Sequence, residues 1–301
     1  MKVATGQFAV SADIAANLAA VDRLMRQAKA EGADVVHFCE AALSGYAGTD
    51  FETFEGFDWD VCQAATRAVM ALAGELGLWT VVGSSHRLSD GHKPHNSVYV
   101  IDASGALIDR YDKRFCAGDA AGLTGDLAHY TPGDHFAVFE IKGVKCGVLV
   151  CHDYRYPELY RAYHRLGVRL MFHGFHAGGL SDERFAAMEA GVGAHLMTGG
   201  TTLPAITMPA GMIASASNNN MWISCPNSCA PKSCWPSFFV RPDGVITGVL
   251  EPEAEGLMIS EVDLAADIYD STVAWRDRAI DGVLHSGERV EDPRSRDRHR
   301  P

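Results

Sequence analysis

Three residues of this chain combine a chemically useful side chain with a position at the end of an apolar, strand-like run. Cys151 follows the run at residues 144–150 and precedes a helix-like segment that begins at Pro157. A thiol at such a turn lies near backbone N–H groups and a helix dipole, which favour the thiolate and expose a nucleophile. A lone cysteine there is also typical of a buried strand end. The ionisable side chains crowded into residues 152–158 favour the catalytic interpretation.

Glu40 and Lys113 occupy equivalent places on other strand-like runs. Glu40 ends the run at residues 34–39, and Lys113 follows the run at residues 106–111. A partly desolvated carboxylate has a raised pKa and can accept a thiol proton, while a buried ammonium can stabilise an oxyanion. Taken alone, Glu40 is more typical of an exposed acid at a strand end, and Lys113 of a surface lysine. Together with Cys151 they predict a cysteine hydrolase.

The elements that must position these residues alternate between helices and strands. Residues 3–84 read as strand, helix, strand, helix, strand, and consecutive strands follow around the turns at 102–105 and 142–143. A helix is expected near residues 157–166, and residues 185–220 are expected to be helical in parts, interrupted by Pro204 and Pro209. The pattern predicts one α/β domain over residues 1–265 with helices on the outer faces of its sheets, and a C-terminal helix and charged tail over residues 266–301.

Composition and charge exclude several classes of function. The chain has 47% hydrophobic and 21% charged residues and a formal net charge of -12. This charge would repel nucleic acid and anionic membranes. We interpret the basic stretch at residues 293–300 as a solvated end. Since neither a secretion signal nor an apolar run of about 18 residues is visible, we expect a cytoplasmic protein whose eight cysteines are reduced.

The residues around the three candidates resemble the nitrilase superfamily of carbon-nitrogen hydrolases. Glu40 stands in Glu-x-x-Leu-x-Gly-Tyr, Lys113 in Tyr-Asp-Lys, and Cys151 in Cys-x-Asp-x-Arg-Tyr-Pro-Glu. The resemblance covers roughly residues 3–262 and is strongest around the cysteine. It implies an α-β-β-α sandwich with two mixed sheets between helices, and a homodimer or larger assembly formed through the helix after the cysteine.

The same resemblance implies a catalytic triad that needs no cofactor. Glu40 would deprotonate Cys151, which attacks an amide or nitrile carbon, and Lys113 with the backbone N–H of His152 would stabilise the tetrahedral intermediate. Ammonia or an amine would leave, and water guided by Glu40 would hydrolyse the thioester.

The chain departs from the family pattern at several positions. Cys39 stands where many relatives have proline, and the usual Lys-x-His-Leu becomes residues 113–116, Lys-Arg-Phe-Cys. Asp126 is the nearest acid before Thr131-Pro132-Gly133, where relatives often carry a second glutamate. Asn218 stands where a structural glutamate is frequent. Asp126 is therefore a possible second carboxylate.

Two further patterns could indicate a metal or nucleotide site. The spacing of Cys225, Cys229 and Cys234 fits no paired-knuckle zinc motif, even with His173 and His176 earlier in the chain. The segment at residues 191–196 lacks the third glycine of a dinucleotide loop and does not follow a credible strand. We expect no metal, nucleotide or other cofactor.

Two alternatives concern the residues next to Cys151. His152 suggests a cysteine–histidine hydrolase, although adjacent residues at a strand end rarely face each other. Asp153, Arg155 and Glu158 are interpreted as an ion-pair cluster that holds the turn. A non-catalytic relative that keeps the fold as a binding or scaffold module is the alternative from another class.

The substrate is expected to be a small amide or N-carbamoyl compound, with nitrile hydrolysis by the same triad as the alternative. Asp126 and Arg155 favour a polar amide with an apolar or aromatic flank. A homodimer is further suggested by the tyrosines at 154, 156, 160 and 163. The expected pocket residues are Tyr46, Arg155, Phe172, His173, Phe175 and His176.

Overall fold

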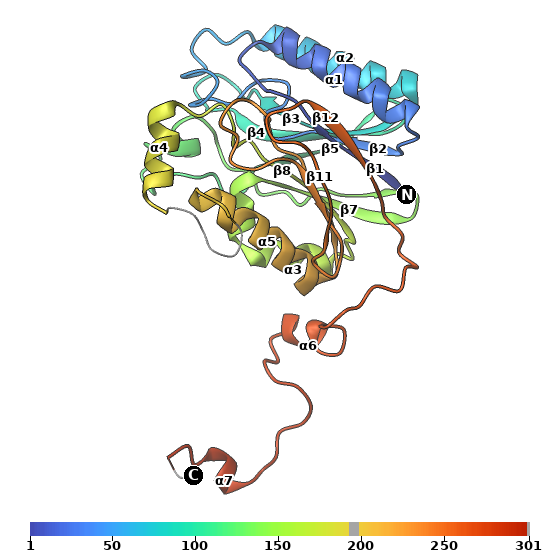
Figure 1. Ribbon diagram of the computed structural model, residues 1–301, viewed down its shortest axis with the longest axis vertical. Helices are drawn as coiled ribbons and strands as arrows, with labels where there is room; N and C mark the ends of the chain where they lie inside the picture. Colours follow the sequence, from blue (N-terminus) through green and yellow to red (C-terminus); the bar gives the residue numbers. More distant parts are fainter. Residues whose placement is uncertain (193–198, 300–301) are drawn as a thin grey trace.

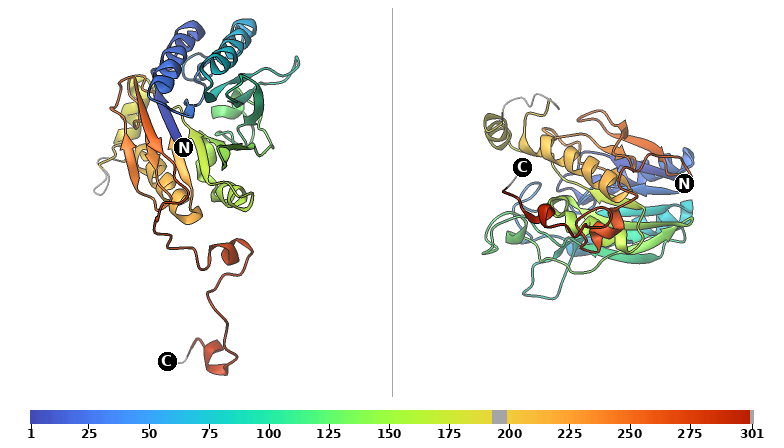
Figure 2. Two further views of the ribbon diagram at one scale, coloured as in Figure 1. Left: turned by 90° about the vertical axis from the view of Figure 1, so that its right-hand side faces the viewer. Right: turned by 90° about the horizontal axis from the view of Figure 1, so that it is seen from below.

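Two six-stranded sheets pack face to face, with helices on their outer sides (Figure 1). The computed structural model describes residues 1–192 and 199–299. Figure 2 shows the same layers from two further directions. This is the α-β-β-α sandwich with mixed sheets that the sequence pattern predicted.

The first sheet has the strand order β12-β1-β2-β3-β4-β5. Strands β1, β2 and β3 are parallel, and β4, β5 and β12 join by antiparallel pairing. Helices α1 and α2 cover its outer face (Figure 1). The bounds are β1 (Lys2–Gln7), α1 (Ile14–Ala30), β2 (Val35–His37), α2 (Trp59–Leu76), β3 (Trp79–His86), β4 (His95–Ile101), β5 (Leu107–Asp112) and β12 (Gly256–Glu261).

The second sheet has the strand order β11-β10-β9-β8-β7-β6. Its parallel centre consists of β7, β8 and β9. Helices α3 and α5 lie on the outer side of this sheet, and α4 lies at one end of the sandwich (Figure 1). The bounds are β6 (Val138–Ile141), β7 (Val144–Val150), α3 (Pro157–Arg165), β8 (Leu170–Gly174), α4 (Asp182–Ala190), α5 (Leu203–Asn219), β9 (Trp222–Cys225), β10 (Phe238–Val240) and β11 (Ile246–Val249).

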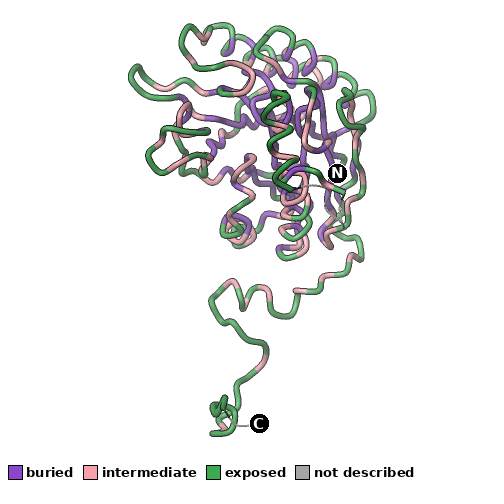
Figure 3. The backbone as a smooth tube through the Cα atoms, turned by 60° about the vertical axis from the view of Figure 1, so that its left-hand side comes forward, coloured by how far each residue is buried: buried purple, intermediate pink, exposed green. Residues whose placement is uncertain are grey.

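The apolar runs of the sequence form the buried layer between the sheets (Figure 3). Phe172 stacks on Phe139 within the second sheet and meets the ring of His37 from the first sheet edge to face. His37 in turn contacts Ser224 through Nδ1 at 2.9 Å. Burial lowers the pKa of His37 well below its ordinary value, so the imidazole is a neutral part of the core.

Several predicted boundaries shift in the structure. β2 is only three residues long, so Glu40 lies in the turn beyond it and not at the strand end itself. Pro204 occupies the first turn of α5, where its missing N–H costs nothing, and Pro209 lies inside that helix without ending it. Residues 193–198, which fall within the segment expected to be partly helical and include most of the glycine segment at 191–196, lie outside the described residues.

The C-terminal region extends away from the sandwich (Figure 1). It carries two short helices, α6 (Arg276–Ile280) and α7 (Pro293–Arg296), in place of the one helix expected. Neither α6 nor α7 contains a buried residue, so neither gains the tertiary packing that stabilises most helices in proteins. None of the described helices is both long enough and apolar enough to cross a membrane.

Candidate active site

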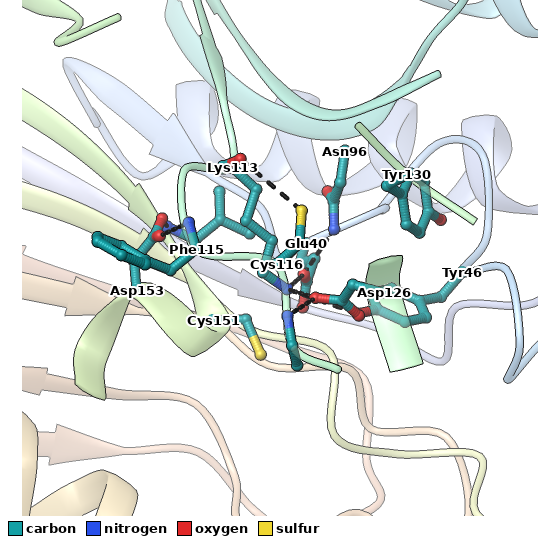
Figure 4. Close-up of polar contacts among 12 residues, drawn as sticks. Glu40, Tyr46, Asn96, Lys113, Phe115, Cys116, Asp126, Tyr130, Cys151 and Asp153 are labelled. Carbon is teal, nitrogen blue, oxygen red and sulfur yellow. Dashed lines mark hydrogen bonds and ion pairs between the residues drawn. The ribbon is translucent and has the colours of Figure 1, made fainter. Parts of the chain in front are cut away.

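Glu40, Lys113 and Cys151 come together at the ends of β2, β5 and β7 (Figure 4). Side chains that follow the carboxyl ends of parallel strands meet at one edge of a sheet, which is where α/β folds place ligands. Packing of the two sheets brings Cys151 of the second sheet next to the pair from the first. Three residues that lie far apart in the sequence are therefore close together in space.

The turn that carries Glu40 passes between two glycines. A Cβ on Gly83 of β3 would lie 2.3 Å from the carbonyl oxygen of Cys39, and one on Gly174 of β8 would lie 3.1 Å from the Glu40 nitrogen. Ala41 has a φ of 55°, a left-handed conformation that costs energy for a residue with a Cβ. The backbone at Glu40 is thus fixed from both sheets.

Cys151 begins a short 3₁₀ turn, Cys151–Arg155, with a strained backbone. Its φ is 43°, again in the left-handed region. Asp153 holds this turn: its carboxylate accepts hydrogen bonds from the Val150 and Phe115 nitrogens at 3.0 and 2.9 Å, and from the Tyr111 hydroxyl at 2.8 Å. Burial raises the pKa of Asp153 to about 6.

The ion-pair cluster expected around this turn does not form. Within the described part of the chain, neither Arg155 nor Glu158 takes part in an ion pair; Arg155 instead lies over the ring of Tyr154. The neutral donors to Asp153 already satisfy the carboxylate, so no arginine is needed to hold the turn.

His173 contacts the backbone of Cys151 from the other side. Its Nε2 lies 3.1 Å from the Cys151 carbonyl oxygen, and its Nδ1 bonds to the Tyr160 hydroxyl. Burial lowers the pKa of His173 to about 3. The ring is therefore neutral, and we assign the proton to Nε2 because the carbonyl can only accept. The ring also stacks on Phe175 at 4.5 Å.

Lys113 is fully buried and shared between two carboxylates. Its Nζ lies 2.7 Å from Glu40 Oε1 and 2.6 Å from Asp126 Oδ2. Burial alone would lower the pKa of Lys113, but Asp126 and Glu40 raise it well above its ordinary value. Asp126 also accepts from the Tyr46 hydroxyl and, at 2.9 Å, from the Ala117 nitrogen.

Glu40 keeps one carboxylate oxygen without a hydrogen-bond partner among the described residues. Oε1 accepts from Lys113 and from Asn96 Nδ2 at 2.7 Å, whereas Oε2 is buried and unsatisfied. An unpaired buried oxygen is costly, and such groups gather where a proton or ligand is to be received. Oε2 is therefore the carboxylate oxygen of Glu40 that remains free for a proton or a ligand.

The turn at Cys151 was expected to favour the thiolate, but the net shift of the thiol pKa is in the opposite direction. Burial raises the pKa of Cys151 well above its ordinary value, and the charge of Glu40 raises it further, against the opposing effect of Lys113. Desolvation and the neighbouring carboxylate outweigh the turn dipole that the sequence pattern suggested. His152 forms no hydrogen bond with the thiol among the contacts of the described residues; its ring meets Tyr156 edge to face.

A cavity of about 470 Å³ opens onto Cys151, a size suited to a small molecule. Of the residues expected to line it, Tyr46, Arg155, Phe175 and His176 do so. Phe172 and His173 do not, which corrects the predicted pocket. Adjacent side chains on a strand point to opposite faces, so Phe172 faces the core between the sheets while His173 faces Tyr160 on α3.

Sequence reasoning missed several residues that contribute to the site. Asn96 on β4 binds Glu40, and many residues that the sequence did not single out as pocket residues line the cavity. A local signal existed at Asn96, which belongs to the polar residues 95–97 at the beginning of β4, before the apolar part of the strand. The missed lining residues depend on tertiary packing and include Tyr154, Arg184, Met188 and Trp235.

The cysteines behind the considered zinc site do not form a ligand set. Cys225 lies in the core, Cys229 is buried, and Cys234 lines the cavity. Among residues 1–192 and 199–299, no three histidine, cysteine or acidic side chains gather as metal ligands would. Independence from metal stays a prediction.

Two of the four tyrosines that suggested a dimer interface are buried within the chain. Tyr160 and Tyr163 have no exposed surface and pack in the core, so they cannot contact a partner. Tyr154 and Tyr156 are half-buried. The dimer itself stays a prediction.

Comparisons with characterised proteins agree with this architecture. An N-carbamoylputrescine amidase of Arabidopsis thaliana is 31% identical over 181 residues, 57% of each chain. An omega-amidase of Xenopus tropicalis is 30% identical over 168 residues, 55% of this chain and 59% of that protein. The matched stretches thus span less than two thirds of these relatives.

Solved structures show the same fold. The crystal structure of an amidase from Nesterenkonia sp. superposes with a TM-score of 0.69 at 22% identity, covering 87% of this chain and 90% of the other. The sequence model of the carbon-nitrogen hydrolases matches residues 2–267. The chain therefore belongs to the carbon-nitrogen hydrolase family of the nitrilase superfamily.

Proposed function

We propose that this protein hydrolyses a non-peptide carbon-nitrogen bond in a small amide or N-carbamoyl compound through a thioester on Cys151. One observation carries the proposal: a thiol lies next to a buried carboxylate with a free oxygen and a buried ammonium, at the wall of a cavity. Each group has a step to perform.

The first step begins with a neutral thiol, because the pKa of Cys151 is raised by burial and by Glu40. Glu40 takes the thiol proton as the sulfur attacks the substrate carbonyl carbon, and the carbonyl electron pair moves to oxygen. A general base is needed here because the resting nucleophile is not ionised. The free Oε2 of Glu40 is the acceptor.

Lys113 has the right number of donors to stabilise the resulting oxyanion. An ammonium has three N–H groups. Two bind Glu40 and Asp126, and the next polar neighbour, the Tyr46 hydroxyl, is 3.5 Å away. The third N–H is therefore only weakly engaged and can turn to an oxyanion, together with the backbone N–H of His152.

Collapse of the intermediate expels ammonia or an amine, which takes the proton held by Glu40. Water then attacks the thioester while Glu40 accepts its proton, and the acid product and free thiol are released. Every proton that Glu40 accepts is returned within the cycle, and no step changes an oxidation state, so the reaction needs no cofactor.

We further propose that the enzyme acts as a homodimer or larger homo-oligomer in the cytoplasm. Light scattering that gives a 32.4 kDa particle would contradict the proposed assembly.

Amide or N-carbamoyl hydrolysis is preferred to nitrile hydrolysis. Relatives with about 30% identity are named as amidases. A structure of the Nesterenkonia amidase is described as carrying the acetamide moiety of fluoroacetamide at its active-site cysteine. Turnover confined to nitriles would favour nitrile hydrolysis. A protein that hydrolyses neither amides, N-carbamoyl compounds nor nitriles would favour the non-catalytic scaffold function.

The test combines turnover with mapping of the nucleophile. Ammonia release is measured for simple amides, N-carbamoyl amino acids and nitriles, and fluoroacetamide adducts are located by mass spectrometry. Cys151→Ala should abolish turnover and labelling, whereas Cys229→Ala, which removes a buried thiol outside the cavity, should leave both intact. Turnover by Cys151→Ala near the parent rate would remove the assignment.

A further inference from the structure

The charges around the cavity differ in sign from those of the whole chain. The formal net charge of the protein is -12, yet the cavity-lining side chains among the described residues include one carboxylate, Asp126, and two guanidinium groups, Arg155 and Arg184. A long-range negative field repels anions. Local positive groups at this position therefore call for an explanation.

The carboxylate that lines the cavity is already engaged. Asp126 accepts from the Tyr46 hydroxyl and the Ala117 nitrogen and pairs with Lys113 at 2.6 Å. Lys113, Glu40 and Asp126 thus form one hydrogen-bonded cluster at the reacting end. Its two carboxylates share one ammonium at the reacting end, and neither carboxylate forms an ion pair with Arg155 or Arg184.

Arg155 is held in place without an anionic partner. Its guanidinium lies over the ring of Tyr154 at 4.7 Å, and Tyr154 is itself fixed by a hydrogen bond from or to Thr207 at 2.9 Å. Stacking uses the face of a guanidinium and leaves the N–H edge available. Within residues 1–192 and 199–299 no carboxylate pairs with that edge.

Arg184 approaches the same cavity from α4. The neighbouring acid on this helix, Asp182, forms an ion pair with Lys232 and so does not neutralise Arg184. No acid of the described chain forms an ion pair with Arg184. Its charge reaches Cys234, another cavity-lining residue, and opposes the effect of burial on the pKa of that thiol.

The imidazoles of the cavity do not change this balance at neutral pH. Burial lowers the pKa of both His129 and His152 below the ordinary value. His176 lies 2.9 Å from Asp50 and stacks on Tyr46, so any charge it carries is matched by that carboxylate. The unmatched charges are those of the arginines.

We propose that Arg155 and Arg184 form a subsite for the carboxylate of the substrate, so that this enzyme selects amide or N-carbamoyl compounds that carry an anionic group at the end remote from the scissile bond. The inference rests on the proposed function. Arginine suits this role because its planar N–H groups match a carboxylate in a bidentate geometry.

The subsite separates this chain from relatives of different substrate charge. N-carbamoylputrescine, named for the Arabidopsis relative, carries an ammonium, which two unpaired guanidinium groups would repel. A carboxylate of the same length would replace repulsion by two charge-assisted contacts. The two arginines would then select substrates by charge and not by length.

The first experiment compares substrates matched in length. Succinamate carries a carboxylate, succinamide is its neutral analogue, and 4-aminobutyramide is cationic. N-carbamoyl-4-aminobutyrate, the neutral N-(4-hydroxybutyl)urea and the cationic N-carbamoylputrescine form the second series. We expect kcat/KM to be about tenfold or more higher for the anion than for the neutral compound, the effect of one charged hydrogen bond. The cation should be turned over most slowly.

Charge-neutralising variants locate the effect. Arg184→Gln and Arg155→Gln should each lower kcat/KM for the anion about tenfold and change that of the neutral compound less than threefold. Arg67→Gln, which removes an exposed arginine of α2 outside the cavity, is the matched control and should change neither. Thermal unfolding of each variant checks that the fold is kept.

Binding to Cys151→Ala tests the subsite without turnover. Calorimetry should show tighter binding of succinamate than of succinamide, and Arg184→Gln in this background should remove the difference. A protein that binds the anion selectively but turns over neither series would overturn the proposed function and keep the subsite. Equal or tighter binding of the neutral or cationic compound, or no binding of either anion, would overturn the subsite.

Discussion

Asp126 Oδ2 lies 2.6 Å from Lys113 Nζ, so the buried ammonium is shared by two carboxylates and not paired with Glu40 alone. The shorter aspartate reaches Lys113 because it lies in the 3₁₀ turn Gly125–Ala128, which also places it within reach of the Ala117 nitrogen. The charge of Asp126 supports the protonated state of Lys113.

Asp126→Asn is expected to lower kcat on the order of tenfold to a hundredfold, the scale associated with one electrostatic or proton-transfer group. Asparagine keeps the size and an acceptor for Tyr46 but removes the charge. Because Asp126 raises the pKa of Lys113, its loss should also shift the alkaline limb of the pH–rate profile to lower pH. Steady-state kinetics across pH provide the measurement.

The control is Asp134→Asn, which removes an exposed carboxylate a few residues along the same chain segment. Its rate and pH profile should match those of the parent. An Asp126→Asn enzyme with the parental kcat and an unshifted pH–rate profile would show that Glu40 alone keeps Lys113 protonated.

His173→Phe tests whether the contact to the Cys151 carbonyl positions the nucleophile. Phenylalanine keeps the ring that stacks on Phe175 but cannot donate to the carbonyl or bond to Tyr160. We expect kcat to fall about tenfold with a smaller change in KM, since a misplaced nucleophile affects the reaction more than binding. The fluoroacetamide labelling rate of Cys151 should fall in parallel.

Phe172→Leu is the matched control because it alters the adjacent residue on the opposite face of β8. It should lower the free energy of unfolding by roughly 1 kcal/mol or more through lost core packing, with little effect on kcat. If the two variants lose kcat equally, the effect of His173 is one of general stability.

The positions of Glu40, Lys113 and Cys151 near strand ends could be predicted from the sequence because each residue follows a recognisable apolar run. The other residues of the site could not, because their positions depend on how the strands pair and how the two sheets and the helices pack. Arg184 reaches the cavity from a helix whose placement no local pattern specifies, and Asn96 meets Glu40 only through the pairing of β3 with β4.

Strand alternation was a signal available in the sequence but not used. Phe172 and His173 are consecutive on a strand, so both could not line one cavity. The effect of burial was harder to anticipate: the turn was expected to favour the thiolate, whereas burial and the closeness of Glu40 raise the pKa of Cys151.

Asp153 predicts a pH dependence of stability. Its pKa is raised from 3.8 to about 6 in the folded protein, so the folded state binds this proton more tightly than the unfolded state. The resulting stabilisation is fully present below the unfolded pKa and is lost as pH rises through about 6. A shift of this size corresponds to roughly 3 kcal/mol.

Denaturant unfolding of the parent and of Asp153→Asn from about pH 3 to about pH 7 isolates this contribution, because that range includes both the unfolded and the folded pKa of Asp153. The difference in unfolding free energy should change in favour of the variant as pH rises. Glu158→Gln, at an exposed acid of the adjoining helix, should show no such trend. A pH-independent difference for Asp153→Asn would mean that the donors from Val150, Phe115 and Tyr111 fully offset burial.

Gly83→Ala tests how the turn bearing Glu40 is fixed. The added methyl group would lie 2.3 Å from the Cys39 carbonyl oxygen and 2.6 Å from the Ala41 nitrogen, both backbone atoms on either side of Glu40. Backbone cannot turn aside as a side chain can, so the turn must move. We expect a loss of about 1 to 3 kcal/mol in unfolding free energy, the usual cost of overpacking, and a fall in kcat of about a hundredfold.

Gly6→Ala makes the same chemical change where the methyl group meets the Phe38 ring at 2.8 Å and no backbone atom of residues 39–41. It should cost comparable stability, because a ring in a packed core also resists displacement, while Glu40 keeps its place relative to Lys113. Activity measured on the folded fraction of each variant then separates the two effects. A Gly83→Ala enzyme that loses no more kcat than Gly6→Ala would show that the Glu40 turn tolerates the shift, and that its position does not depend on close packing against β3.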